Sequence, residues 1–165
     1  MSNDKLLRIY LTDHLAGAAG GVELAKRCLS SNKENALGGY LETHLIPAIL
    51  EDKRSLESLM ERLRVPRARW KQAAARSAEK AGRLKLNGRV TGYSPLSRLV
   101  EIEGMCLGIE GKGSLWHSLK HISGSSQALR DVDLDRLIER ARRQREELES
   151  HRLDAAERAL ASSMH

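Results

Sequence analysis

The apolar residues of this chain return at the spacing of an α-helix, and no stretch alternates as a β-strand does. Between Asn3 and Leu29 apolar and small side chains recur every three or four residues, and four later stretches repeat the pattern. Aromatic residues make up only 3% of the chain and Phe is absent, whereas β-sandwich cores depend on aromatic and β-branched side chains. The sequence therefore predicts an all-α protein.

Capping and turn signals divide the chain into helical segments. The expected segments are Asn3–Leu29, Lys33–Leu63, Arg67–Leu86, a segment capped by Ser94, a short helix Leu115–His121, and Asp131–Ala161. Ser94 precedes Pro95, which suits the first position of a helix. Pro47 is expected to kink the second segment because it removes a backbone donor, and Gly111 with Gly113 is expected to stop or bend the fourth.

The middle of the first segment, Ala16–Gly21, contains three glycines and is poor in helix propensity. A helix keeps such residues where another backbone comes close, so we expect Gly17 and Gly21 to be packing residues. The alternative is a break at this point that leaves two shorter helices.

Long amphipathic segments with short connections are typical of an antiparallel, up-and-down four-helix bundle. The segments that begin near Asn3, Lys33, Ser94 and Asp131 are the expected core helices. Arg67–Leu86 is then an additional shorter helix that lies alongside the core or bridges the second and fourth segments. At 165 residues, the chain has the length of one domain, and we predict a single helical-bundle domain over residues 1–165.

Several polar side chains fall within or beside the apolar stripes. His44 and Glu51 are seven residues apart on one face, as are Glu103 and Glu110, and Gln144 lies near the Leu148 stripe. The candidate metal ligands are His44, Glu51, Glu103, Glu110, Glu147 and His151. Carboxylates and imidazoles that converge between helices build di-metal sites in bundles, with iron, manganese or zinc as the candidate ions. The alternative is a core of salt bridges and hydrogen bonds, which needs no cofactor.

This combination of helical segments and inner polar residues resembles the ferritin-like superfamily. The metal sites of that superfamily use a Glu-x-x-His pair on each of two helices, and no histidine here has an acidic residue three positions before it. The nearest substitute is Glu147 with His151. The resemblance therefore implies the fold more than an oxidase or iron-storage activity. The stretch SPLSRLVEIEG is also similar to bacterial helical proteins of unknown function.

A second pair of imidazoles, His117 and His121, lies one helical turn apart, but two ligands do not complete a metal site. Between Arg62 and Arg89 ten basic residues face a single acid, Glu79. This excess could neutralise phosphates, although Trp70 offers the one ring for stacking. A solvated helix face is the alternative interpretation.

Other features limit the function classes. No phosphate-binding loop and no nucleophile–base pair can be identified, so the sequence favours a non-catalytic protein over an enzyme. Cys28 and Cys106 are isolated, as expected of buried thiols in a reducing cytoplasm. The N-terminus lacks the apolar run of a signal peptide, and no stretch is long enough to span a bilayer.

We therefore expect a cytoplasmic, ferritin-like bundle that acts through interactions or in stress physiology and lacks a conventional di-iron motif. A divalent-metal bundle with a redox or storage role is one alternative. A protein that binds nucleic acid without sequence preference through residues 62–89 is the other. A homo-oligomer is a further candidate assembly, and no membrane partner is expected.

Overall fold

All the regular secondary structure in residues 3–83 and 92–161, which the computed structural model describes, is helical. The elements are α1 (Asn3–Ser30), α2 (Ala36–Tyr40), the π-helix η1 (Leu41–Leu45), α3 (Ile46–Arg62), α4 (Arg67–Arg83), α5 (Pro95–His121), the 3₁₀ turn η2 (Ser123–Ser125), α6 (Gln127–Arg130) and α7 (Leu134–Leu160). The all-α prediction is confirmed for this part of the chain.

The first segment forms one helix, α1, without interruption at its glycines. Buried side chains on both sides of the glycine stretch, Leu11 and Leu15 before it and Ala25 and Cys28 after it, pack each half of the helix into the interior. Tertiary packing thus outweighs the low helix propensity of the middle. The alternative of two shorter helices does not occur.

The second segment contains a short π-helix just before Pro47. Pro47 has no N–H to donate and its ring crowds the preceding turn, and the five residues Leu41–Leu45 adopt the wider spacing in which Ile46 N–H donates to the carbonyl of Leu41. The expected irregularity therefore lies one turn before the proline, and α3 continues behind it to Arg62.

The fourth segment is a single helix, α5, that continues to His121. The hydroxyl of Ser94 accepts a hydrogen bond from the backbone N–H of Ser97, with Pro95 at the first helical position, as the sequence predicts. The predicted stop at Gly111 and Gly113 is wrong. The buried residues Leu115, Trp116 and Leu119 extend the apolar stripe of α5 beyond the glycines, so packing keeps the helix continuous.

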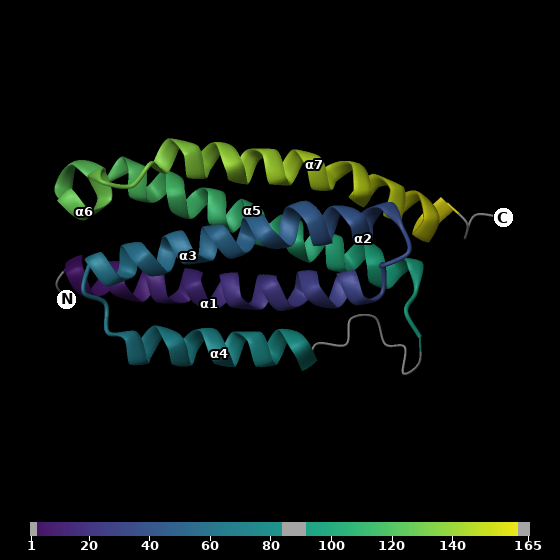
Figure 1. Ribbon diagram of the computed structural model, residues 1–165, viewed down its shortest axis with the longest axis horizontal. Helices are drawn as coiled ribbons and strands as arrows, with labels where there is room; N and C mark the ends of the chain where they lie inside the picture. Colours follow the sequence, from purple (N-terminus) through teal and green to yellow (C-terminus); the bar gives the residue numbers. More distant parts are fainter. Residues whose placement is uncertain (1–2, 84–91, 162–165) are drawn as a thin grey trace.

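The long helices lie nearly parallel to one long axis, and each runs opposite to the long helix before it in the chain (Figure 1). α5 packs against α7 along most of its length, and α4 packs on the outer side of α1. α4 carries the chain back along the molecule, so that α3 and α5 begin at the same end. Long antiparallel helices are thus confirmed, and the shorter fourth helix lies alongside α1.

Two apolar clusters form the interior. One cluster includes Leu11, Leu59 and Trp116, near the end where α4 begins. The other includes Leu41 and Leu148 and lies toward the opposite ends of the same helices. On α1, the glycine stretch separates the residues that belong to the two clusters, and this is where the interior is incompletely filled.

Candidate functional site

A cavity of about 380 Å³, open on one side, lies between α1, α3 and α5. Apolar side chains such as Leu45, Ile49 and Ile109 form much of its wall. Glycines supply another part of the wall: Gly17 and Gly21 from α1, and Gly104, Gly108 and Gly111 from α5. Its volume falls in the range of small-molecule pockets, roughly 300–1,000 Å³.

The prediction that Gly17 and Gly21 allow close helix packing is wrong. A Cβ atom placed on either residue would meet nothing within 4 Å, and the same is true of Gly108 and Gly111 on α5. Only Gly104 fits the expected pattern in this lining, since its Cβ would lie 3.0 Å from Leu24 Cδ2. The glycines therefore leave space between the helices.

Among the charged side chains of the lining, Asp52 on α3 and Lys112 on α5 are largely buried. Asp52 is only 3% exposed. Lys112 Nζ donates a hydrogen bond of 2.5 Å to Asp52 Oδ2 and another to Gln144 Oε1 of α7. Gln144 in turn donates to Asp52 Oδ2 through its amide nitrogen, at 3.1 Å. These contacts join three helices beneath the cavity.

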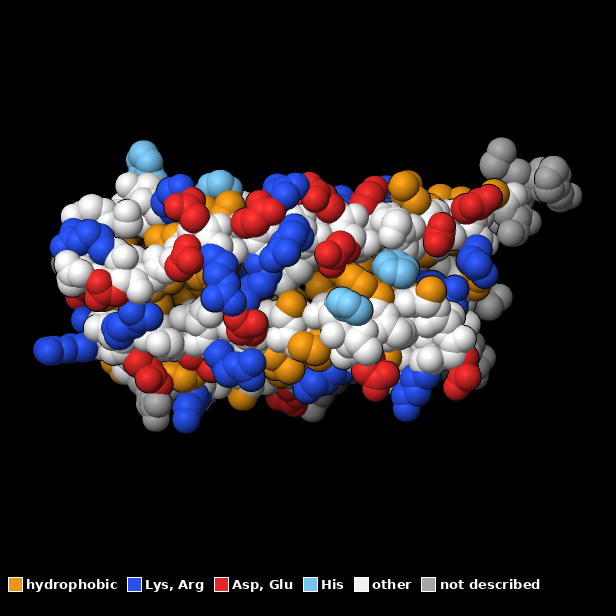
Figure 2. Space-filling model, turned by 45° about the horizontal axis from the view of Figure 1, so that its top comes forward, with side chains coloured by type: hydrophobic (Ala, Val, Ile, Leu, Met, Phe, Trp, Pro, Cys, Tyr) orange, Lys and Arg blue, Asp and Glu red, His pale blue; other side chains and the backbone are white. Residues whose placement is uncertain are grey.

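The network extends outward to the surface through Arg140 of α7. The Arg140 guanidinium forms ion pairs with Asp52 and with Glu51, and Arg136 lies 3.5 Å from the same Glu51 carboxylate. Glu51 is itself exposed, so the network runs from the interior to solvent. On the face seen in Figure 2, basic and acidic side chains are interleaved in the same manner.

Burial sets the electrostatics of this network. Removal from water lowers the pKa of Lys112, and the neighbouring Asp52 carboxylate opposes that shift. At the outer end, the hydrogen bond from Arg140 lowers the pKa of Glu51. An ammonium group that is poorly hydrated and close to an apolar cavity is suited to bind an acceptor from a ligand.

Further along the lining, α1 and α5 contribute aromatic and imidazole groups. The rings of Tyr10 and His14 meet edge to face with centroids 4.6 Å apart, and burial lowers the pKa of His14. Trp116 follows Lys112 by one helical turn and is 1% exposed. Its indole Nε1–H has no hydrogen-bond partner among the residues that the structure describes.

The carboxylates among the six predicted metal ligands face basic or hydroxyl groups. Glu51 pairs with Arg140, while Glu103 lies 3.8 Å from Arg152 and Glu110 lies 3.5 Å from Arg145. Glu147 accepts a hydrogen bond of 3.3 Å from the hydroxyl of Tyr40.

The two predicted histidine ligands lie near Tyr40. The ring of Tyr40 contacts both His44 and His151, at centroid distances of 6.0 and 4.9 Å. Within residues 3–83 and 92–161, no three His, Cys, Asp or Glu side chains come close enough together to hold a metal ion.

Sequence reasoning missed the inner members of the charge network, Asp52, Lys112 and Arg140. Asp52 is in phase with Leu45, Leu56 and Leu59, and this register could have identified it. The sequence pattern predicts the neighbouring residue Glu51 instead, because a small error in helical phase moves a residue from the core to its flank. For Arg140, the signal is its helical spacing from two buried residues of α7, three positions after Leu137 and four before Gln144.

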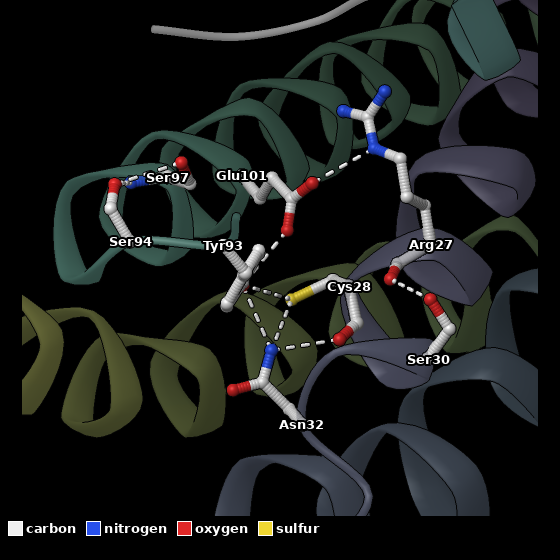
Figure 3. Close-up of polar contacts among 8 residues, drawn as sticks. All are labelled: Arg27, Cys28, Ser30, Asn32, Tyr93, Ser94, Ser97 and Glu101. Atoms are coloured by element: carbon white, nitrogen blue, oxygen red, sulfur yellow. Dashed lines mark hydrogen bonds and ion pairs between the residues drawn. The ribbon is translucent and has the colours of Figure 1, made fainter. Parts of the chain in front are cut away.

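A second buried polar cluster joins the end of α1 to the start of α5 (Figure 3). The buried carboxylate of Glu101 accepts hydrogen bonds from Arg27 Nε at 2.8 Å and from the Tyr93 hydroxyl at 2.9 Å. Asn32 donates to the same hydroxyl at 2.9 Å. The Cys28 thiol lies 3.8 Å from this hydroxyl, and burial, with Glu101 nearby, raises its pKa to about 12.

Such a thiol remains protonated near neutral pH and is a poor nucleophile. Cys106, the other cysteine, is buried as well, as the sequence predicts. The cluster around Glu101 therefore fixes the position of Tyr93 and the entry into α5, and it offers no reactive group.

The remaining sequence candidates lie at the surface or in the core. His117 and His121 are exposed near the end of α5. Lys71, Arg76 and Lys80 of α4 are exposed, whereas Trp70 packs into the core and cannot stack on a base. Residues 84–91, the end of the predicted basic stretch, lie outside the described residues.

No family model matches the chain, and neither the curated proteins nor the solved structures include a significant match to it. None of the helices in the described ranges combines the length and apolarity needed to cross a membrane.

Proposed function

We propose that this protein is a non-catalytic helical bundle that binds a small, largely apolar ligand in the cavity between α1, α3 and α5. The observation that carries the proposal is the cavity itself, whose wall combines apolar side chains with glycine backbone and leaves about 380 Å³ unfilled. Because the cavity is open on one side, its apolar wall is in contact with water, and an apolar ligand that displaces this water is favoured by the burial of apolar surface.

The placement of polar groups supports the same function. Small-molecule sites are typically apolar with a few polar groups that fix the orientation of the ligand. Here Asp52 and Lys112 lie on one side of the lining, and Tyr10 and His14 belong to another part of it. Bundles commonly place ligand sites between facing helices.

We also propose a ferritin-like arrangement of the four core helices. A helix pair formed by α1 and α3 is joined to a second pair, α5 and α7, by one long crossover that contains α4 (Figure 1). One long crossover between two helical hairpins is the connectivity of ferritin-like folds.

The functional alternatives are a divalent-metal bundle and a nucleic-acid-associated protein. Arginine or hydroxyl groups already occupy the carboxylates of the predicted metal set, as at Glu103 with Arg152 and Glu147 with Tyr40, and a metal ion would have to displace them. Base stacking by α4 would require Trp70 to leave the core. The cavity therefore offers the better-supported function.

The test is a titration with N-phenyl-1-naphthylamine, an uncharged apolar fluorophore. Saturable binding by the full chain is expected, and Gly21→Leu should abolish it because the new side chain extends into the cavity. Gly39→Leu is the matched control, since Gly39 lies outside the lining and also has nothing within 4 Å of its Cβ position. Equal binding by both variants, or none by the wild type, contradicts the proposal.

A further inference from the structure

We infer that the ligand of this cavity is an apolar molecule with a single carboxylate, which binds to Lys112 with Trp116 as a second donor. The inference deepens the proposed function and rests on it. Three independent features lead to this ligand class: an unused donor on Lys112, an unpartnered indole N–H on Trp116, and the charge balance of the network beneath the cavity.

The ammonium group of Lys112 has three N–H donors. Two are engaged, by Asp52 Oδ2 and by Gln144 Oε1. The third has no hydrogen-bond partner among the described residues, and the side chain is part of the cavity lining. A ligand acceptor can therefore reach this donor without the loss of either existing bond.

Trp116 adds a second donor one helical turn along α5. Its Nε1–H is buried without a partner in the described part of the chain, and the residue lines the same cavity. A buried donor without an acceptor is rare in native proteins and costs free energy. Lys112 and Trp116 are four residues apart, so their side chains lie on one face of α5. A turn of the buried indole ring toward the cavity would let both donors bind one carboxylate.

The charge balance favours an acid over a neutral head group. The largely buried members of the network beneath the cavity are two cations, Lys112 and Arg140, and one carboxylate, Asp52, whereas Glu51 and Arg136 are exposed to water. One monocarboxylate would balance the remaining positive charge. A ligand cation would add to it.

Other charges in the lining do not alter this balance. Lys53 is paired with Glu57 at 2.5 Å within α3. Asp13 also contributes to the lining, but it is exposed, so water screens its repulsion of an acid. The lowered pKa of Lys112 agrees with the inference, because an ammonium that has lost hydration gains most from a bound anion.

The experiment compares decanoate with 1-decanol, which has the same chain length and no charge, by calorimetric titration of the full chain. Decanoate is expected to bind at least about tenfold more tightly, the usual advantage of a charge-assisted hydrogen bond. In Lys112→Met this preference should disappear while the affinity for decanol is retained. Lys120→Met is the matched control and should keep the preference, since Lys120 lies on the same helix, is paired with Asp135 and is outside the lining.

Trp116→Phe provides a second variant that keeps the size of an aromatic ring, and it should weaken decanoate binding several-fold. Equal affinity of the wild type for acid and alcohol overturns the inference and leaves the proposed function standing. An undiminished preference in Lys112→Met also overturns it. If neither compound binds, the proposed function fails as well. If Lys112→Met does not fold, the inference is tested by the affinities of the wild type for decanoate and 1-decanol and by the decanoate affinity of Trp116→Phe.

Discussion

Asp52 on α3 accepts a hydrogen bond of 2.5 Å from Lys112 on α5, and the two residues are 60 positions apart in the chain. Asp52 also pairs with Arg140 on α7, so one carboxylate joins three helices. Because it lies in the interior, it compensates two cations that would otherwise be poorly solvated. Asp52 therefore links α3 to both α5 and α7.

We expect Asp52→Ala to lower the free energy of unfolding by about 3–5 kcal/mol, the usual cost of leaving a buried charge unpaired. The adjacent variant Glu51→Ala should cost about 0–1 kcal/mol, since Glu51 is 48% exposed and its ion pairs are partly screened. Urea denaturation of both variants measures the difference. A similar loss in the two variants would mean that Asp52 is not the centre of the network.

The difference between Glu51 and Asp52 shows how far buried polar residues can be predicted from the sequence. Helical period predicted the long helices and an interior that contains polar groups. It could not distinguish Glu51 from Asp52, because adjacent residues are 100° apart and the phase of a stripe is known no better than about 40°. Which of the two lies inside depends on Lys112 and Arg140, whose contacts with α3 are set by tertiary packing.

The glycines show a second limit of sequence interpretation. Gly17 and Gly104 have the same local signal, yet one has open space at its Cβ position and the other lies 3.0 Å from Leu24. A glycine within a helix can mark either a position where a neighbouring helix packs closely or a position next to a cavity. The choice depends on the neighbouring helix, which the local sequence does not describe.

From this difference follows a prediction about alanine substitutions. Gly17→Ala should raise the free energy of unfolding by up to about 1 kcal/mol, because alanine favours the helix and meets no neighbour. Gly38→Ala should lower it by about 1–3 kcal/mol or more, because the new Cβ would lie 2.0 Å from the backbone oxygen of Asn32. Thermal melting of both variants checks the opposite signs, and a stabilised Gly38→Ala would contradict the observed turn.

The cluster around Glu101 predicts the role of one hydroxyl group. Tyr93→Phe removes a donor to Glu101 and an acceptor for Asn32, and should cost about 1–3 kcal/mol of unfolding free energy. Tyr10→Phe is the control, since the Tyr10 hydroxyl makes only a long bond of 3.4 Å to Ser118 near the surface. If chemical denaturation gives the same small loss for both, Tyr93 does not fix the start of α5.

The two half-buried histidines, His14 and His151, predict a pH dependence of stability. Burial lowers the pKa of each below its ordinary value of 6.5, so the folded protein binds fewer protons than the unfolded chain as the pH falls past that value. This contribution to stability is complete above pH 6.5 and is lost as the pH falls through the folded-state pKa. The slope is at most about 1.4 kcal/mol per pH unit for each histidine.

Urea midpoints measured between pH 7.5 and 5.5 should therefore decrease with acidification, and the double variant His14→Gln, His151→Gln should reduce the slope. His117→Gln is the matched control, because His117 is exposed on α5. Ligand binding offers a second readout, since His14 lines the cavity and His151 does not. An occupied cavity that shields His14 from protonation lowers its folded-state pKa further, so it should steepen the slope of His151→Gln and leave that of His14→Gln unchanged. Identical slopes in all variants would show that neither imidazole is buried enough to couple protonation to folding.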